Sequence, residues 1–158
     1  MGSVTRRELE EAYGRYRACR EEASRTGDWS PWAEQFTEDA HYVEHAYGEL
    51  RGREAIRDWI TRVMAPFPHM TFPDDWVVFD PERGWVVFQC QNRLAHPADA
   101  GGEPFQFSSW SLLHYAGGFQ WSYEEDMYNP ADGAAAISAW RRAGGRFESL
   151  ELVRMTRR

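Results

Sequence analysis

The stretch TGDWSPWAEQFTEDAHYVEH, residues 26–45, contains the signals for a helix end, a helix start and a strand. Gly27 is the residue type that most often ends a helix in the left-handed conformation. The Ser-Pro pair at 30–31 supplies an N-cap followed by a proline at the first helical position, and we expect this second, short helix to end near Asp39. Alternation around two tyrosines then predicts a strand over 41–47.

Working outward from this stretch, the sequence predicts a helix on each side. Residues 5–26 place large apolar side chains at three- and four-residue spacing and acidic side chains on the opposite face, which is typical of an amphipathic helix. Downstream, a third helix is expected from Gly52 to the residues before Pro66, since proline disrupts helices. Its apolar face would consist of Ile56, Trp59, Ile60 and Val63.

After the third helix the apolar pattern changes to a period of two, which predicts strands. Short Gly- and Pro-containing segments separate them and suit antiparallel hairpins. A last helix is expected over 131–142, followed by a tail over 144–158. The four predicted strands are 70–80, 84–95, 104–116 and 119–129.

Helices grouped before a run of strands predict an α+β fold. We expect one domain over 1–158, with its core at about 5–143, because this length fits a single core. The expected shape is a cone: a curved antiparallel sheet wrapped by N-terminal helices around a central pocket.

The composition excludes several classes of protein. A formal net charge of −7 argues against nucleic acid as a partner. No apolar run approaches the roughly 20 residues of a membrane span, and the charged N-terminal residues do not resemble a secretory signal. Two cysteines make no disulfide framework, and neither they nor the histidines show metal-ligand spacing. We therefore expect a cytoplasmic protein without metal, and no Gly-rich phosphate loop points to a nucleotide cofactor.

Residues 26–45, followed by Gly48 and the RGREAI segment at 51–56, resemble the SnoaL-like, ketosteroid-isomerase-like group of the nuclear-transport-factor-two-like superfamily. The resemblance covers roughly residues 5–143, and the EEDMYNP segment at 124–130 is similar to an actinobacterial subgroup. It implies the cone-shaped fold. It identifies no single activity, because the fold hosts isomerases, cyclases, dehydratases, epoxide hydrolases and binding proteins.

In ketosteroid-isomerase-like proteins the first strand supplies a carboxylate base, and two alignments place this base differently. Counting from Asp39-Ala40 selects Glu44, whereas counting back from Gly48 selects His45. Adjacent strand residues face opposite sides, so only one of the two should face the pocket, and Glu44 is preferred. The alternative is that both are surface groups without a catalytic role.

The resemblance also assigns a pocket-facing side to the last strand, which carries Ser122, Glu124 and Asp126 on one face. Two carboxylates on one strand face lie about 7 Å apart. If they are buried together, their repulsion raises one pKa and yields an acid beside a base. Alternatively, the carboxylates are solvated or paired with arginines.

Other family positions depart from the isomerase pattern. Ser111 stands where the isomerase has an acidic oxyanion-hole donor, and Arg20 stands at the position of the tyrosine donor, with Tyr16 one turn earlier. Isomerisation of the ketosteroid type is therefore not predicted. His69 resembles a histidine of scytalone-dehydratase-like proteins that removes a proton, and it could also be a loop residue without a role.

These residues together predict a cofactor-independent enzyme that isomerises, cyclises or dehydrates a small apolar or polycyclic substrate such as a polyketide, steroid or terpenoid. The alternative is a module of the same fold that only binds a small molecule or dimerises. In either case we expect a homodimer through the open sheet face. The predicted catalytic residues are Glu124, Asp126, His69, Glu44 and His45, and the predicted substrate-binding residues are Tyr16, Arg20, Tyr42, Asn92, Ser111 and Ser122.

Overall fold

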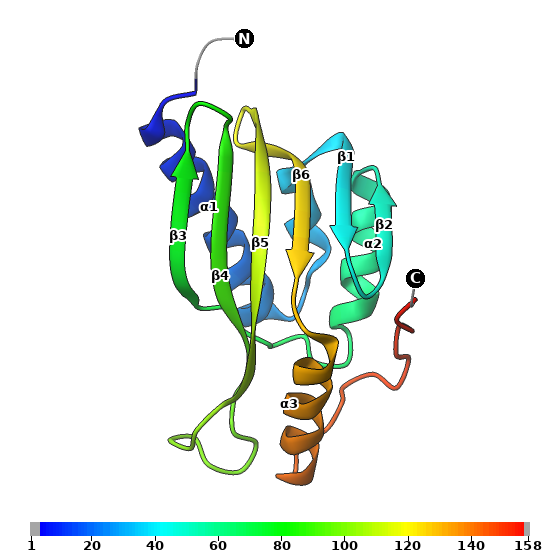
Figure 1. Cartoon of the computed structure of the whole chain (residues 1–158). Coiled ribbons are helices and arrows are strands. Elements are labelled where there is room, and N and C mark those ends of the chain that lie inside the picture. Colours follow the sequence, from blue (N-terminus) through cyan, green and yellow to red (C-terminus); the bar gives the residue numbers. More distant parts are fainter. Residues whose placement is uncertain (1–3, 157–158) are drawn as a thin grey trace.

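The computed structural model describes residues 4–156 and confirms the α+β class. Three α-helices and a 3-10 helix combine with six strands in one sheet (Figure 1). The helices are α1 (Arg6–Thr26), η1 (Ser30–Gln35), α2 (Arg53–Met64) and α3 (Pro130–Arg142). The strands are β1 (Phe36–Glu44), β2 (Gly48–Arg51), β3 (Asp74–Asp80), β4 (Trp85–Leu94), β5 (Phe105–Gly117) and β6 (Gln120–Met127).

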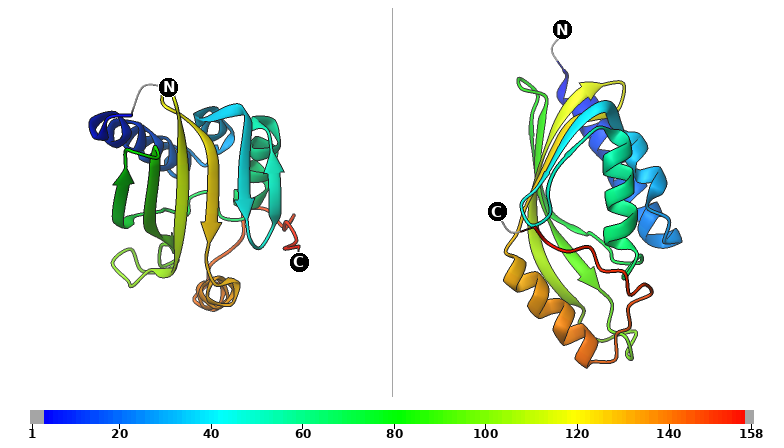
Figure 2. Two further views of the ribbon diagram at one scale, coloured as in Figure 1. Left: turned by 45° about the horizontal axis from the view of Figure 1, so that its top comes forward. Right: turned by 90° about the vertical axis from the view of Figure 1, so that its right-hand side faces the viewer.

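The sheet has the strand order β2-β1-β6-β5-β4-β3. Its neighbouring strands pair antiparallel, apart from β1 and β6, which are parallel. The sheet curves strongly, and α1, η1 and α2 cover its concave side, while α3 follows β6 at one end (Figure 2). This arrangement leaves a central cavity between the sheet and the helices.

Helix α1 has the boundaries that its sequence predicts. The Thr5 side chain caps its first turn by accepting the Glu8 N–H, and Gly27 ends it with φ 78° while donating its N–H to Ala23. One face of the helix is buried, including Leu9, Tyr13 and Tyr16. This face brings tyrosine side chains and Arg20 into the molecule from the helical side.

Two sequence predictions in the first third of the chain were wrong in extent. The short helix ends at Gln35, because Phe36 is already extended with φ −96° and ψ 150° and pairs with Trp121 of β6. Residues 36–39 therefore belong to β1, where Phe36 is completely buried. The chain then turns back at 45–47 and forms β2, a strand that the sequence analysis did not anticipate.

The meander strands agree with the prediction, apart from the first. Strand β3 begins at Asp74 instead of residue 70, since Pro73 lacks the N–H that a ladder needs. Before it, Thr71 forms only an isolated bridge with Arg93. No helix in residues 4–156 combines the length and apolar character needed to cross a membrane.

An irregularity in β6 decides which of its side chains face inward. His114 pairs with Tyr123, but the next residue of β5, Tyr115, pairs with Trp121, so Ser122 is an extra residue in β6. Such a bulge shifts the alternation of side chains. As a result Trp121 and Glu124 are both buried although they are three residues apart.

Candidate active site

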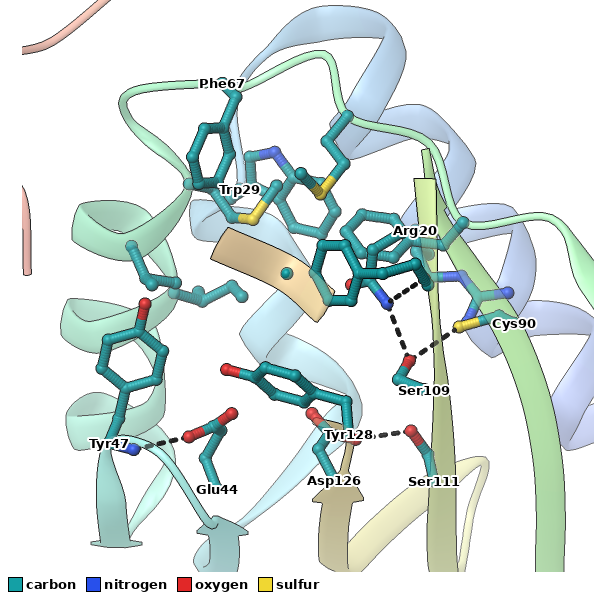
Figure 3. A pocket seen from close by; sticks show the side chains of 18 of the residues that line it. Arg20, Trp29, Glu44, Tyr47, Phe67, Cys90, Ser109, Ser111, Asp126 and Tyr128 are labelled. Carbon is teal, nitrogen blue, oxygen red and sulfur yellow. Dashed lines mark hydrogen bonds between the residues drawn. The ribbon is translucent and has the colours of Figure 1, made fainter. Parts of the chain in front are cut away.

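The central cavity has a volume of about 400 Å³ and mostly aromatic and apolar walls. The sheet supplies its floor, and α1, η1, α2 and α3 supply the other walls (Figure 3). This size suits a small organic molecule. The large side chains that line it include Trp29, Trp32, Trp59, Phe67, Phe72 and Phe88.

Two carboxyl groups of β6 lie in this apolar cavity within one hydrogen-bond network. Glu124 Oε1 accepts hydrogen bonds from the hydroxyls of Tyr16 (2.7 Å) and Tyr42 (3.4 Å). Asp126 accepts hydrogen bonds from the hydroxyls of Tyr42 and Ser111. Tyr42 therefore joins the two carboxyl groups, and helix α1 and strands β1, β5 and β6 all contribute to the network.

Burial raises the pKa of both carboxyl groups. The pKa of Glu124 rises well above its ordinary value through burial and the charge of Asp126, while the hydroxyls of Tyr16 and Tyr42 oppose this rise. Burial also raises the pKa of Asp126, and the hydroxyls of Ser111 and Tyr42 oppose that rise. The pair therefore holds a proton at pH values where ordinary carboxyl groups have lost it.

The tyrosines of the network stay protonated. Burial raises the pKa values of Tyr16 and Tyr42 well above their ordinary value, and the nearby carboxyl groups raise them further. Both hydroxyls therefore act as hydrogen-bond donors inside the cavity.

Of the two candidates at the end of β1, Glu44 faces the cavity. Its Oε2 accepts the backbone N–H groups of Ala46 (2.7 Å) and Tyr47 (2.6 Å). Burial raises the pKa of Glu44, and the Tyr128 hydroxyl opposes this rise. The His45 ring lies on the outer surface, half exposed, with Nε2 2.7 Å from Glu125 Oε1. The structure therefore brings Glu44, but not His45, to the cavity.

His69 does not converge with the carboxyl groups, contrary to the sequence-based expectation. Its side chain is 55% exposed, and its Nδ1 lies 2.7 Å from the backbone oxygen of Ser24. The next residue, Met70, is the one that lines the cavity. The sequence analysis placed residue 70 at the start of a strand, whereas in the structure it precedes β3, and Met70 and Phe72 of this segment line the cavity while His69 does not.

Ser122 also fails to reach the cavity, although it was expected to share a face with Glu124. The bulge in β6 turns it aside, and its hydroxyl donates to the His114 backbone oxygen at 3.4 Å. A simple period of two therefore gives the correct face for Glu124 and Asp126 and the wrong face for Ser122.

Arg20 and Asn92 line the cavity, as expected for substrate-binding residues. Arg20 is 5% exposed, and its Nη2 lies 2.7 Å from Asp74 Oδ1. Asn92 Nδ2 donates to the Ser109 hydroxyl (2.9 Å) and to the Phe107 backbone oxygen (3.3 Å).

Sequence reasoning missed several polar groups of the cavity wall, among them Tyr128 and Cys90. Tyr128 lines the cavity beside Glu44, and a period of two continued from Glu124 and Asp126 would have found it. Cys90 lines the cavity beside Ser109. Within residues 4–156, no group of three His, Cys, Asp or Glu side chains is placed to hold a metal ion.

Comparison with protein families identifies one match: the model of the SnoaL-like domain family matches residues 16–124. No curated protein matches the chain. The solved structures provide many matches of the same fold.

Three of these structures illustrate the range of related proteins. A protein with a ketosteroid isomerase-like fold from Catenulispora acidiphila, solved in complex with trimethylamine, is 20% identical, with TM-score 0.62, 85% of this chain covered and 95% of that one. IdmH, a proposed polyketide cyclase from Streptomyces antibioticus, is 19% identical, with TM-score 0.62 and coverages of 83% and 99%. An LEH-like epoxide hydrolase of M. tuberculosis is 12% identical, with TM-score 0.61 and coverages of 85% and 92%. At these identities the likeness shows the fold.

Proposed function

This chain belongs to the SnoaL-like domain family, and we propose that it is a cofactor-independent acid–base enzyme acting on a small apolar or polycyclic substrate. The reaction would be an isomerisation, a cyclisation or a dehydration. One observation carries the proposal: Glu124 and Asp126 lie in one hydrogen-bond network inside an apolar cavity, joined through the Tyr42 hydroxyl. In the proposed arrangement Glu124 holds the proton of the pair and Asp126 is the carboxylate. A carboxylic acid and a carboxylate held apart in proton affinity are an acid and a base for proton transfer.

The proposed chemistry begins with Asp126. Its carboxylate has lone pairs beyond those that Tyr42 and Ser111 occupy, so it can accept a proton from a carbon next to a substrate carbonyl. The C–H electron pair then becomes part of an enolate. Hydrogen bonds from Tyr16 or from protonated Glu124 stabilise the enolate oxygen, and the apolar walls strengthen these interactions by excluding water.

The fate of the enolate decides the reaction. Return of the proton to a different carbon gives an isomer, attack of the enolate on a second carbonyl carbon gives a ring, and loss of a β-hydroxyl with a proton gives water and an alkene. Glu44 is a further carboxyl group at the same cavity wall and could take part in the return of the proton.

Proton abstraction can be tested without the natural substrate. A bicyclic ketone such as 2-decalone in D₂O exchanges hydrogen for deuterium next to its carbonyl, which NMR detects. We expect the protein to accelerate this exchange and Asp126→Asn to slow it by about 100-fold or more, the usual contribution of a general base. Glu125→Gln is the matched control, since Glu125 is adjacent in β6 but lies on the outer face with His45. Equal exchange in Asp126→Asn and wild type would refute the proposal.

A binding module is the second candidate function, and one observation favours it. Three carboxyl groups of the cavity already accept hydrogen bonds from protein groups, as a passive pocket would require. Tight binding of a bicyclic ketone by calorimetry, with no accelerated exchange, would select this function.

We also propose that the outer face of the sheet mediates a homodimer. Val78 and Trp110 are 58% and 54% exposed there, and exposed apolar patches can mark protein–protein interfaces. Sedimentation of a dimer that Trp110→Glu dissociates would support this assembly, and a wild-type monomer at micromolar concentration would exclude it.

A further inference from the structure

Arg20 is a buried positive charge on the cavity wall. It is 5% exposed, and its guanidinium carbon lies 5.3 Å from the centre of the Phe88 ring and 5.8 Å from that of Phe72. Removing a charged group from water is unfavourable unless the group is paired and hydrogen-bonded. The partners of Arg20 therefore determine what else the site can bind.

The pairing of Arg20 is incomplete. Asp74 Oδ1 lies 2.7 Å from its Nη2, but Asp74 Oδ2 is also 3.1 Å from Nε of Arg17. Arg20 thus shares the Asp74 carboxylate with Arg17, which also has Glu21 Oε1 3.7 Å from its Nη2. In addition, Arg20 Nε is buried without a hydrogen-bond partner among the described residues. An N–H of a charged group in this state is an unfilled donor at the cavity.

The charges of the cavity are separated along the sheet. Its acidic side chains, Glu44, Glu124 and Asp126, belong to the neighbouring strands β1 and β6. Arg20 instead lies beside Cys90 of β4 and is paired with Asp74 of β3 (Figure 3). Between the acidic strands and Arg20 the cavity wall carries neutral polar groups, among them Ser109 and Asn92.

The strand register gives the distance between the two ends. Asp126 lies opposite Ser111, which lies opposite Phe88, and Cys90 is two residues further along β4. Neighbouring strands are about 4.8 Å apart, and each residue advances about 3.4 Å along a strand. Two strand spacings and two residues therefore place the backbones of Asp126 and Cys90 about 12 Å apart. A fused-ring molecule can therefore place an anionic group at Arg20 and a reacting carbon near Asp126, while the two negative charges stay apart.

We propose, building on the function proposed above, that the substrate is a fused-ring carboxylate whose carboxyl group binds to Arg20. A bound carboxylate would supply a hydrogen-bond acceptor to the Arg20 guanidinium, whose Nε has no partner among the described residues and whose ion-pair partner Asp74 is shared with Arg17. Guanidinium groups bind carboxylates through two parallel hydrogen bonds, which makes Arg20 a specificity-determining residue.

The test compares two probes of the same shape, naphthalene-2-carboxylate and the neutral naphthalene-2-carboxamide, by calorimetry at pH 7.5. We expect wild type to bind the carboxylate about tenfold or more tightly than the amide. Arg20→Met should abolish this preference and retain binding of the amide. Arg20→Lys, which keeps the charge without the planar fork, should retain part of the preference.

Arg17→Met is the matched control. Arg17 contacts the same Asp74, but its side chain is 48% exposed and does not line the cavity. The control variant should therefore keep the preference for the carboxylate. Equal affinity of wild type for both probes, no detectable binding of the carboxylate, or an equal loss in Arg17→Met and Arg20→Met would each overturn the proposal. Should Arg20→Met not fold, the wild-type comparison and Arg20→Lys still decide.

The two proposals fail in distinguishable ways. A preference for the carboxylate without deuterium exchange in 2-decalone would support the anion site and refute the acid–base function. Deuterium exchange in 2-decalone that Asp126→Asn abolishes, without any preference for the carboxylate probe, would support the acid–base function and refute the anion site.

Discussion

Glu124 and Glu125 are adjacent in β6, but their carboxyl groups lie on opposite faces of the sheet, and their pKa values are shifted in opposite directions. Glu124 is 2% exposed inside the cavity, where burial raises its pKa well above the ordinary value. Glu125 accepts hydrogen bonds from His45 and Tyr123 on the outer face, and these bonds lower its pKa. The pair thus provides a variant and a control one residue apart.

The first prediction concerns stability against pH. The folded protein keeps a proton on Glu124 at pH values above 4.5, its ordinary pKa, where the unfolded chain has lost it. The free energy of unfolding therefore falls as pH rises from 4.5 toward the raised pKa, by up to about 1.4 kcal/mol per pH unit for this proton. The Gln side chain of Glu124→Gln resembles the protonated acid. The free energy of unfolding of this variant should therefore fall less with rising pH, and at pH 8 the variant should be more stable than wild type. Urea unfolding at several pH values measures this.

Glu125→Gln should behave in the opposite way. The lowered pKa of Glu125 means that its carboxylate stabilises the fold above its ordinary pKa of 4.5, and this stability is lost only as pH falls through the lowered value. The variant should therefore be less stable than wild type at pH 8. A decline with pH in Glu124→Gln as steep as in wild type would show that Glu124 is not protonated in the fold.

The second prediction concerns the pH dependence of deuterium exchange. The Tyr42 hydroxyl donates to Asp126 and lowers the pKa of this carboxyl group against the effect of burial. Tyr42→Phe removes that donor, so Asp126 should ionise at a higher pH. The rising limb of the pH–rate profile should therefore shift to higher pH.

Tyr123→Phe serves as its control, since Tyr123 donates to Glu125 on the outer face. It should leave the profile unchanged. An unshifted rising limb in Tyr42→Phe would mean that Asp126 is not the base.

Local patterns in the sequence were sufficient to predict the parts of the site that depend on them. A period of two placed Glu124 and Asp126 on one face, and the helical spacing of α1 turned Tyr16 inward. The family resemblance restricted the base on β1 to Glu44 or His45, and the alternation of strand residues required that only one face the cavity. In the structure Glu44 is the one of the two that faces the cavity.

The remaining errors arise from tertiary contacts. The bulge that turns Ser122 away is defined by its pairing with β5, which no local signal announces. The position of His69 depends on the Ser24 carbonyl, 45 residues earlier in the chain. Likewise, the incomplete pairing of Arg20 follows from Asp74 and Arg17 meeting in space, so its role could not be deduced from α1 alone.

The third prediction concerns the two thiols. Burial raises the pKa of Cys90 to about 11, whereas Cys19 is exposed. Because the thiolate is the nucleophile, Cys90 should react with iodoacetamide at pH 7.5 about 300-fold more slowly than an ordinary thiol of pKa about 8.5. Cys19→Ser keeps only the Cys90 thiol and Cys90→Ser keeps only the Cys19 thiol, so mass spectrometry of the alkylated variants would measure the two reaction rates separately. Similar rates would indicate that the Cys90 end of the cavity is open and hydrated.

The last prediction concerns the C-terminal strap, residues 146–156, which runs back from α3 toward the turn between β1 and β2 (Figures 1 and 2). Phe147 packs against Phe67, a residue of the cavity wall, and Met155 itself lines the cavity. One hydrogen bond that holds the strap is donated by the Glu148 backbone N–H to the Pro66 backbone oxygen (2.9 Å). Near its other end, the Thr156 hydroxyl donates to the Tyr47 oxygen (2.7 Å). These contacts indicate that it covers part of the cavity mouth.

Phe147→Ala should loosen this cover. Loss of a partly buried aromatic side chain should cost about 1–2 kcal/mol of stability. Under native conditions it should also increase quenching of tryptophan fluorescence by acrylamide, because Trp29, Trp32 and Trp59 line the cavity. Leu150→Ala is the control, since Leu150 lies in the same strap and is 87% exposed, so neither stability nor quenching should change. If Phe147→Ala is quenched no more than wild type, the strap does not limit access, and entry to the cavity must lie elsewhere.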